Sequence, residues 1–264
     1  MAIPVILTVS GHDPSGGAGI QADIESIVAA GCRAASAVTC LTVQDTINVR
    51  QVVASSPALL NDQIRTLLDD IGIAVIKIGL IPNMAILEVI TKFLQDHPDV
   101  PVVLDPVLTS GAGTELAGNR LVSAYRKQLL PRTTLITPNS IEARRLSGTQ
   151  LMDDCGRELL TQGCQAVLIT GTHESDSDVI NRLYRHDSDV VTSSWPRLHG
   201  CYHGSGCTLA SSAAAFIGKG LGLSDAVEKA LEYTWNSLSH GDRPGKGQLL
   251  PDRLFTIRNG EASC

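Results

Sequence analysis

Short aliphatic runs alternate along this chain with longer stretches that have the apolar spacing of helices. The runs that we predict to be strands fall at residues 5–9, 34–40, 49–54, 74–78, 102–104, 134–136 and 166–169. The stretch after the first run places Ile20, Ile24 and Ile27 on one helical face. Buried strands separated by helices are typical of a mostly parallel sheet that helices cover on both faces. The alternation therefore predicts an α/β fold.

One segment departs from the strand–helix alternation. Two β-like runs, at residues 179–184 and 190–192, flank His186-Asp187-Ser188 and predict a hairpin, which would form a small antiparallel edge of the sheet. No repeat, low-complexity tract or linker interrupts the 264 residues, so we predict a single domain over residues 1–264. Because 43% of the residues are hydrophobic but only 3% are aromatic, the core is expected to be aliphatic.

Composition argues against two classes of partner. The net charge is −6, the pI is about 5.6 and no basic run occurs, which argues against nucleic acid. No apolar run approaches the roughly 20 residues of a membrane span, and no signal peptide precedes the first predicted strand. The seven cysteines include no C-x-x-C pair. We therefore expect a soluble cytoplasmic protein with no membrane partner.

The stretch from His203 to Ala210 joins a glycine-rich turn to a helix. Gly204 and Gly206 bracket Ser205, and Cys207 follows before a run of small apolar residues that suits a buried helix. The first amides of a helix lack partners within the helix, and the dipole makes that end positive, so such a turn suits an anion such as phosphate. The same dipole would lower the pKa of the Cys207 thiol. The sequence therefore predicts an anion site with a reactive cysteine at its mouth.

Polar side chains recur close to the ends of the predicted strands. These residues are Asp13, Gln44, Asp105, Asn139 and Thr170, with Gln44 in a loop predicted at residues 42–46. Ligands of open parallel sheets bind at the carboxyl ends of the strands. We therefore expect these residues to form one site along one edge of the sheet.

Five motifs in order carry a resemblance to a known family. They are Ser15-Gly16-Gly17-Ala18-Gly19-Ile20-Gln21-Ala22-Asp23, Leu41-Thr42-Val43-Gln44, Val103-Leu104-Asp105-Pro106-Val107, Thr137-Pro138-Asn139 with Glu142-Ala143, and His203-Gly204-Ser205-Gly206-Cys207-Thr208-Leu209. Together they resemble the hydroxymethylpyrimidine/phosphomethylpyrimidine kinases of thiamine biosynthesis, which belong to the ribokinase-like superfamily. The resemblance extends from the N-terminus to about Lys219.

The resemblance implies a ribokinase-like α/β kinase that works as a homodimer with ATP and Mg²⁺. It would phosphorylate a small-molecule substrate, 4-amino-5-hydroxymethyl-2-methylpyrimidine, and then the monophosphate. The residues that would contact the pyrimidine are Gly11, Asp23, Gln44 and Val107. An amide such as that of Gln44 suits an aminopyrimidine because it offers both a donor and an acceptor.

The resemblance also assigns the phosphate side of the site. Asp105 and Glu142, with Asn139, would hold Mg²⁺ directly or through water, because a hard cation prefers oxygen ligands. The residues that would contact the nucleotide are Asn139, Thr170, Gly171, Ser205 and Gly206. The turn Gly204-Ser205-Gly206-Cys207 would cradle the transferred group, and Cys207 would accept the hydroxymethyl proton.

The chain differs from the family pattern in several places. Thr170-Gly171-Thr172-His173 stands where the family carries lysine before Gly-Gly-His, which removes a cation expected near the phosphates. Asp45 follows Gln44 where the family usually has asparagine, and Leu80 replaces a common methionine. The family's glycine-rich tail has a faint counterpart in Gly245-Lys246-Gly247, and Lys246 is a candidate for the missing positive charge.

Two other functions stay open at this point. Pyridoxal kinase activity is one, because its hydroxymethyl-pyridine has a similar shape; the other is a non-catalytic protein that binds pyrimidine or pyridoxal phosphate.

A zinc site at His199, Cys201, His203 and Cys207 matches no common spacing, and His203 stands where a serine-hydrolase elbow needs glycine. Trp195 and Trp235 are interpreted as packing residues.

Overall fold

A nine-stranded mixed sheet forms the centre of the computed structural model, which describes residues 2–109 and 116–261. The strand order is β3-β2-β1-β4-β5-β6-β7-β8-β9. The strands are β1 (Val5–His12), β2 (Arg33–Gln44), β3 (Val49–Ala54), β4 (Val75–Ile78), β5 (Val102–Leu104), β6 (Leu135–Ile136), β7 (Ala166–Ile169), β8 (Asp178–Arg185) and β9 (Val191–Pro196). Strands β2, β1, β4, β5, β6 and β7 run parallel, whereas β3, β8 and β9 pair antiparallel with their neighbours. The sheet confirms the predicted α/β class and the antiparallel edge at residues 178–196.

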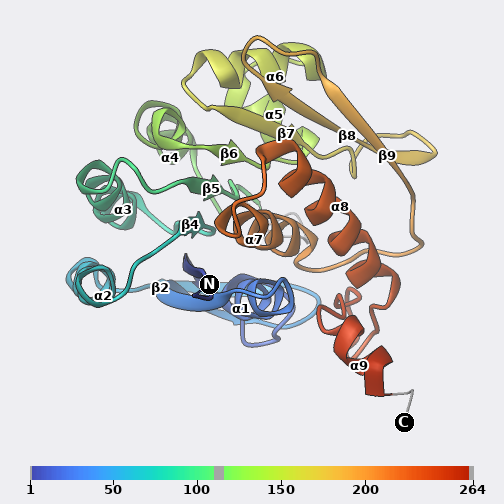
Figure 1. The fold of residues 1–264 in the computed structure, drawn as a ribbon, viewed down its shortest axis with the longest axis horizontal. Helices are drawn as coiled ribbons and strands as arrows, with labels where there is room; N and C mark the ends of the chain where they lie inside the picture. Colours follow the sequence, from blue (N-terminus) through green and yellow to red (C-terminus); the bar gives the residue numbers. More distant parts are fainter. Residues whose placement is uncertain (1, 110–115, 262–264) are drawn as a thin grey trace.

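Helices cover both faces of the sheet (Figure 1). They are α1 (Gly19–Ala29), α2 (Pro57–Asp70), α3 (Met84–Asp96), α4 (Asn119–Ala124), α5 (Ser140–Ser147), α6 (Met152–Thr161), α7 (Ser205–Gly218), α8 (Leu223–Ser239) and α9 (Phe255–Glu261), with a π-helical turn η1 (Tyr125–Leu129) and a 3₁₀ turn η2 (Leu130–Arg132). Among these elements, no helix has both the length and the apolar character that crossing a membrane requires. Helix α4 begins at Asn119 and leads directly into η1; Ser110 to Glu115 lie outside the described residues.

Two separate hydrophobic cores follow from the alternation of side chains along the strands. Leu7 and Val9 of β1 point into a core shared with α2 and α3, whereas Ile6 points into a core shared with α7 and α8. Both cores are built mainly from Ile, Leu, Val and Ala, in agreement with the low aromatic content. The two-sided burial explains why the parallel strands read as continuous apolar runs.

Strand β2 is longer than the sequence predicted. We expected a loop from residue 42, but Thr42, Val43 and Gln44 pair with Val52, Gln51 and Val49 of the antiparallel β3. This pairing depends on a neighbouring strand, and the local sequence does not show which strand will be the neighbour. As a result, Gln44 is the last residue of a strand.

Candidate active site

A cavity of about 620 Å³ lies at the carboxyl ends of the parallel strands. The predicted site residues in its lining are Gly11, Gln44, Asp105, Val107, Asn139, Glu142, Thr170, Gly204, Ser205, Gly206 and Cys207. Two predicted residues do not line it. Asp23 has no exposed surface, and Gly171 packs against β8, where an added Cβ would overlap the Ile180 carbonyl oxygen. The topology therefore brings most of the predicted residues together but leaves Asp23 with no position from which to touch a ligand.

The turn before α7 has the geometry of an anion site. Gly204 caps the helix with a φ of 74°, in the left-handed region that favours glycine. No side chain caps the helix. The amides that follow Gly204 therefore remain available to a ligand in the cavity, which these residues line. This arrangement supports the predicted role of the turn in binding phosphate.

The predicted low pKa of Cys207 is wrong. Burial raises the pKa of this thiol to about 12; Lys77 opposes the rise, while Asp105 and Asp23 add to it. The proximity of Cys207 in turn opposes the rise in the pKa of Asp105. Loss of solvent and proximity to two carboxylates therefore raise the pKa of the thiol by more than the dipole of α7 lowers it.

Asp105 and Glu142 place two carboxyl groups in the cavity wall. Asp105 follows β5 and is buried, and its Oδ2 atom has no hydrogen-bond partner within the described part of the chain. Burial, followed by repulsion from Asp23, raises the pKa of Asp105 although Lys77 opposes the rise. Burial and then repulsion from Asp105 raise the pKa of Glu142 to about 8. Two crowded carboxyl groups, one with an oxygen that accepts no hydrogen bond from the described residues, suit a cation.

A capping box holds Glu142 in place at the start of α5. The Glu142 amide donates to Asn139 Oδ1 (2.9 Å), and Glu142 Oε2 accepts from the Asn139 amide (3.0 Å). Glu142 Oε1 accepts from the Leu108 amide (3.2 Å). The described residues contain no group of three or more His, Cys, Asp or Glu side chains arranged to hold a metal alone. The site therefore fits Mg²⁺, which usually binds to one or two carboxylates and completes its shell with phosphates and water.

Lys77 is a functional candidate that the sequence analysis missed. It lies in β4 with no exposed surface, and its Nζ is 2.7 Å from Asp23 Oδ1 and 4.0 Å from Asp105 Oδ2. Burial disfavours its charge, but Asp23, Cys207 and Asp105 together raise the pKa of Lys77 above its usual value. A lysine within the aliphatic run Val75-Ile76-Lys77-Ile78 was the signal that could have identified it.

His203 joins the turn before α7 to the loop after β1 and to the end of β2 in the cavity wall. Its Nε2 is 2.7 Å from Asp13 Oδ2 and 2.8 Å from Gln44 Nε2. Burial raises the pKa of Asp13, but hydrogen bonds from His203 and Ser15 outweigh it and lower the pKa overall. Because its Nε2–H group donates to Asp13, the ring cannot also accept a hydrogen bond from Gln44 Nε2; it lies against the Gln44 amide and limits its position by contact. Gly11 lies beside them and excludes any larger residue, because a Cβ would approach Cys40 Sγ to 2.8 Å.

The departures from the family pattern occupy different places. Leu80 lines the cavity beside Gly11. Asp45 is in an exposed turn, where it accepts from the Ile47 and Asn48 amides and pairs with Arg50. Lys246 is exposed and does not line the cavity, so its placement does not supply the missing charge.

The far end of the cavity is apolar and aromatic. Trp195 and Trp235 pack against each other with ring centroids 5.9 Å apart, and both line the cavity beside Leu231 and Leu238. The interpretation of these tryptophans as packing residues is therefore incomplete, because they also present a surface to a ligand. Their dimensions and chemistry suit a flat heteroaromatic ring.

The sheet is covered by helices on both faces, and one cavity at its edge contains an anion turn and two carboxyl groups. This combination is typical of α/β enzymes that transfer phosphoryl groups. The chain belongs to the phosphomethylpyrimidine kinase family, whose model matches residues 13–252. This match confirms the family resemblance drawn from the five motifs.

Individual relatives agree with the family. The chain is 34% identical to the hydroxymethylpyrimidine/phosphomethylpyrimidine kinase of Haemophilus influenzae over 92% of this chain and 93% of that protein. It is 35% identical to the thiamine biosynthetic bifunctional enzyme TH1 of Arabidopsis thaliana over 99% of this chain, and spans about half (52%) of that relative. The ADP complex of Bacillus subtilis pyridoxal kinase has the same fold, with a TM-score of 0.89, 28% identity, and coverage of 98% of this chain and 100% of that one.

Proposed function

We propose that this protein transfers the γ-phosphoryl group of ATP to the hydroxymethyl group of 4-amino-5-hydroxymethyl-2-methylpyrimidine, and then phosphorylates the monophosphate. One observation carries the proposal: a single cavity joins Gln44, beside His203, to the anion turn at Gly204–Cys207 with Asp105 lining the same cavity. Family membership supports the reaction and the substrate class.

Substrate and nucleotide would occupy opposite ends of the cavity. Gly11, Gln44 and Val107 line the end proposed for the pyrimidine, and the Gln44 amide can donate to a ring nitrogen or accept from the amino group. Asn139 and Thr170 line the proposed nucleotide side, and the tryptophan-lined end would receive the adenine ring. The amides of Ser205 and Gly206 would receive the transferring phosphoryl group.

Asp105 and Glu142 would hold Mg²⁺, with Asn139 supporting Glu142 through the capping box. When bound, the cation neutralises phosphate charge as it develops. Its positive charge would also favour the ionised form of Glu142, which burial and Asp105 disfavour in the ligand-free protein.

Cys207 is the proposed acceptor of the hydroxymethyl proton. Because the pKa of its thiol is about 12, a resting thiolate is rare at neutral pH. Lys77, which opposes the rise in the pKa of Cys207, and a cation held at Asp105 would both favour the thiolate, and the thiolate sulfur would accept the proton as the hydroxyl gives it up. The hydroxyl oxygen then forms the new bond to phosphorus as the bond to the ADP oxygen breaks.

The proposal is tested by measuring ADP release and product mass with Mg²⁺-ATP and the hydroxymethylpyrimidine, its monophosphate or pyridoxal. We expect pyrimidine mono- and diphosphate. Cys207→Ala should reduce kcat by roughly 10²–10⁴-fold, the usual contribution of a general base, and Cys207→Asp should keep part of the activity. Full activity in Cys207→Ala would remove the base role.

Pyridoxal kinase activity is the second candidate, favoured by the TM-score of 0.89 to a pyridoxal kinase. Pyridoxal phosphate as the main product would select it. Binding of these ligands with no product from any of them would instead support a non-catalytic role.

A homodimer and a cytoplasmic location complete the proposal. The resemblance supports the dimer, and so do Leu41, Val43 and Val53, three exposed apolar side chains on the β2–β3 hairpin that a second copy could cover. Light scattering during size-exclusion chromatography would give the mass, and a monomer would contradict this part of the proposal.

A further inference from the structure

The chain returns to the active site near its C-terminus. After α8, Asp242 and Leu250 form one isolated bridge and Tyr202 and Leu249 another, so this segment lies beside the residues that precede the anion turn. The His203 amide donates to the Leu249 carbonyl (2.9 Å). This segment then places Arg253, which is only 2% exposed, beside the two glycine-rich turns.

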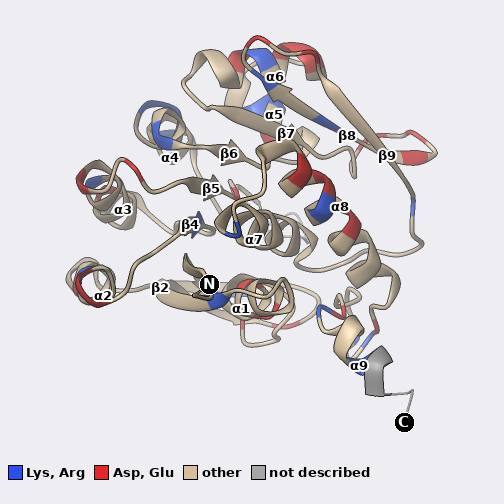
Figure 2. Ribbon diagram, viewed as in Figure 1, with Lys and Arg blue, Asp and Glu red and all other residues tan. Residues whose placement is uncertain are grey.

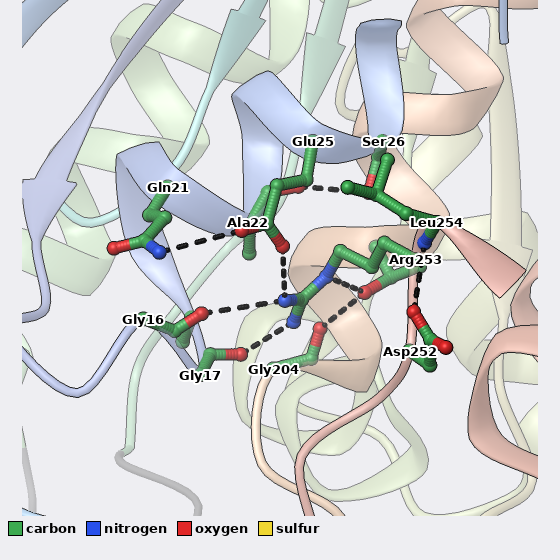
Figure 3. A network of polar contacts seen from close by, with 12 residues as sticks. Gly16, Gly17, Gln21, Ala22, Glu25, Ser26, Gly204, Asp252, Arg253 and Leu254 are labelled. Atoms are coloured by element: carbon green, nitrogen blue, oxygen red, sulfur yellow. Dashed lines mark hydrogen bonds and ion pairs between the residues drawn. The ribbon is translucent and has the colours of Figure 1, made fainter. Parts of the chain in front are cut away.

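Arg253 contacts both turns at once (Figure 3). Its Nη2 donates to the Gly17 carbonyl, and its Nη1 donates to the Gly16 carbonyl (3.3 Å) and pairs with Glu25 (3.1 Å). On the other side, its Nε donates to Thr208 Oγ1 (2.9 Å). The Thr208 hydroxyl in turn donates to the Gly204 carbonyl (2.9 Å). One guanidinium therefore links residues 16–17 to the first turn of α7.

The two turns are also in direct contact. A Cβ on Gly204 would overlap the Gly17 carbonyl oxygen, and a Cβ on Gly17 would overlap the His203 ring. Glycine at both positions permits this approach. The Gly17 carbonyl oxygen, which forms part of the contact, is the atom that receives the Arg253 Nη2 hydrogen bond.

We propose that Arg253 is a positioning residue that sets the distance between the substrate side and the phosphate side of the active site. It does not line the cavity, so it acts through the two turns. Residues 11–19 carry Gly11 and Asp13, and residues 203–207 carry the anion turn. This inference rests on the proposed kinase function, because a displacement of about 1 Å between reacting groups can cost roughly 10²-fold in rate.

Arginine has the chemistry that this role needs. Its planar fork provides donors in fixed directions, which suits the carbonyls of residues 16 and 17 together with a hydroxyl on a third side. Lysine would keep the charge but could not hold these groups in a fixed relative orientation.

The test compares Arg253→Met, Arg253→Lys and a matched control, Arg258→Met, in the full chain. Arg258 lies five residues later, its side chain is 70% exposed and it pairs with Asp252. We expect Arg253→Met to lower kcat by about 10²-fold while the dissociation constants of the pyrimidine and ADP change less than threefold. Arg253→Lys should recover only a small part of the loss, and Arg258→Met should leave kcat within twofold.

Two further measurements separate positioning from loss of structure. Hydrogen exchange should accelerate at residues 16–18 and 204–207 together in Arg253→Met, and stay unchanged in Arg258→Met. Millimolar methylguanidinium should raise the kcat of Arg253→Ala, whereas urea at the same concentration should not. A decrease in kcat that equals the loss of folded protein, with no rescue, would overturn the proposal.

Other outcomes are equally decisive. Unchanged exchange at both turns in Arg253→Met overturns the proposal whether or not the protein is active. If wild-type protein phosphorylates none of the substrates, the proposed function fails, and the exchange measurement alone decides whether Arg253 links the turns. If the Arg253 variants do not fold, Thr208→Val should lower kcat about tenfold and Thr208→Ser less than twofold; equal kcat values would overturn the proposal.

Discussion

Asp23 and Asp105 are two buried aspartates that contact the same lysine but have opposite surroundings. Asp23 accepts hydrogen bonds from Thr8 Oγ1 (2.5 Å), Lys77 Nζ (2.7 Å) and Ser211 Oγ (2.7 Å). Asp105 Oδ2 is 4.0 Å from the same Nζ, is repelled by Glu142, and accepts no hydrogen bond from any described residue. The protein therefore completes the charge balance of one aspartate internally and leaves that of the other to a ligand.

The difference separates a residue that supports the site from one that belongs to it. A satisfied buried ion pair fixes geometry, and removing one partner leaves an uncompensated charge. Crowded carboxyl groups with raised pKa values are instead typical of functional sites. The two aspartates thus respond differently to the same substitution.

The largest difference between Asp23 and Asp105 is expected when each is replaced by asparagine. Asp105→Asn should lower kcat by on the order of 10³-fold, a typical cost for losing electrostatic stabilisation of the transition state, without lowering the free energy of unfolding. Asp23→Asn should lower the free energy of unfolding and reduce kcat much less, because its side chain does not line the cavity. Steady-state kinetics and chemical denaturation measure both effects. Asp99→Asn, an exposed aspartate before β5, is the matched control; equal kcat losses at positions 23 and 105 would erase the distinction.

Removing the shared lysine should produce the next largest effect. Lys77→Met leaves Asp23 buried without its cation and should cost about 3–5 kcal/mol of unfolding free energy. Adding Asp23→Asn to Lys77→Met should recover much of that loss, because the uncompensated charge disappears. Urea denaturation of the three variants gives these values, and a cost below about 1 kcal/mol for Lys77→Met would show that the pair is not the main support of Asp23.

The pH dependence of stability should also distinguish the carboxyl pair of Asp105 and Glu142 from the satisfied Asp23. Without metal, the unfolded chain loses the Glu142 proton near pH 4.5, whereas the folded protein keeps it up to about pH 8. Between these values the folded state binds more protons, so its stability decreases as pH rises, by up to about 1.4 kcal/mol per pH unit. Glu142→Gln removes this pH dependence and otherwise changes the free energy of unfolding by the same amount at every pH.

Denaturation in EDTA from pH 5 to 8 checks this prediction. The variant should gain stability relative to wild type as pH rises, and Mg²⁺ with ADP should reduce the gain because the cation favours ionised Glu142. A difference between variant and wild type that is constant with pH would contradict the raised pKa.

Much of the fold and of the cavity lining follows from local sequence. Apolar runs of the parallel strands, the glycine turn before α7 and the polar residues after strand ends are all short-range patterns. Because parallel strands share one carboxyl edge, these patterns place Asp105, Asn139 and Thr170 together with the turn at Gly204. The order of the five motifs also indicated the family before any distance was known.

Tertiary structure decided the chemistry of those residues. The extension of β2 to Gln44 depends on pairing with β3, and the ion pair of Asp23 with Lys77 joins residues 54 positions apart. The pKa of Cys207 is raised by burial and by carboxylates from other elements, against the dipole of its own helix. Arg253 reaches the two glycine turns from the other end of the chain. Local sequence sets backbone preference, whereas desolvation and Coulomb energy depend on neighbours that only the folded chain brings into contact.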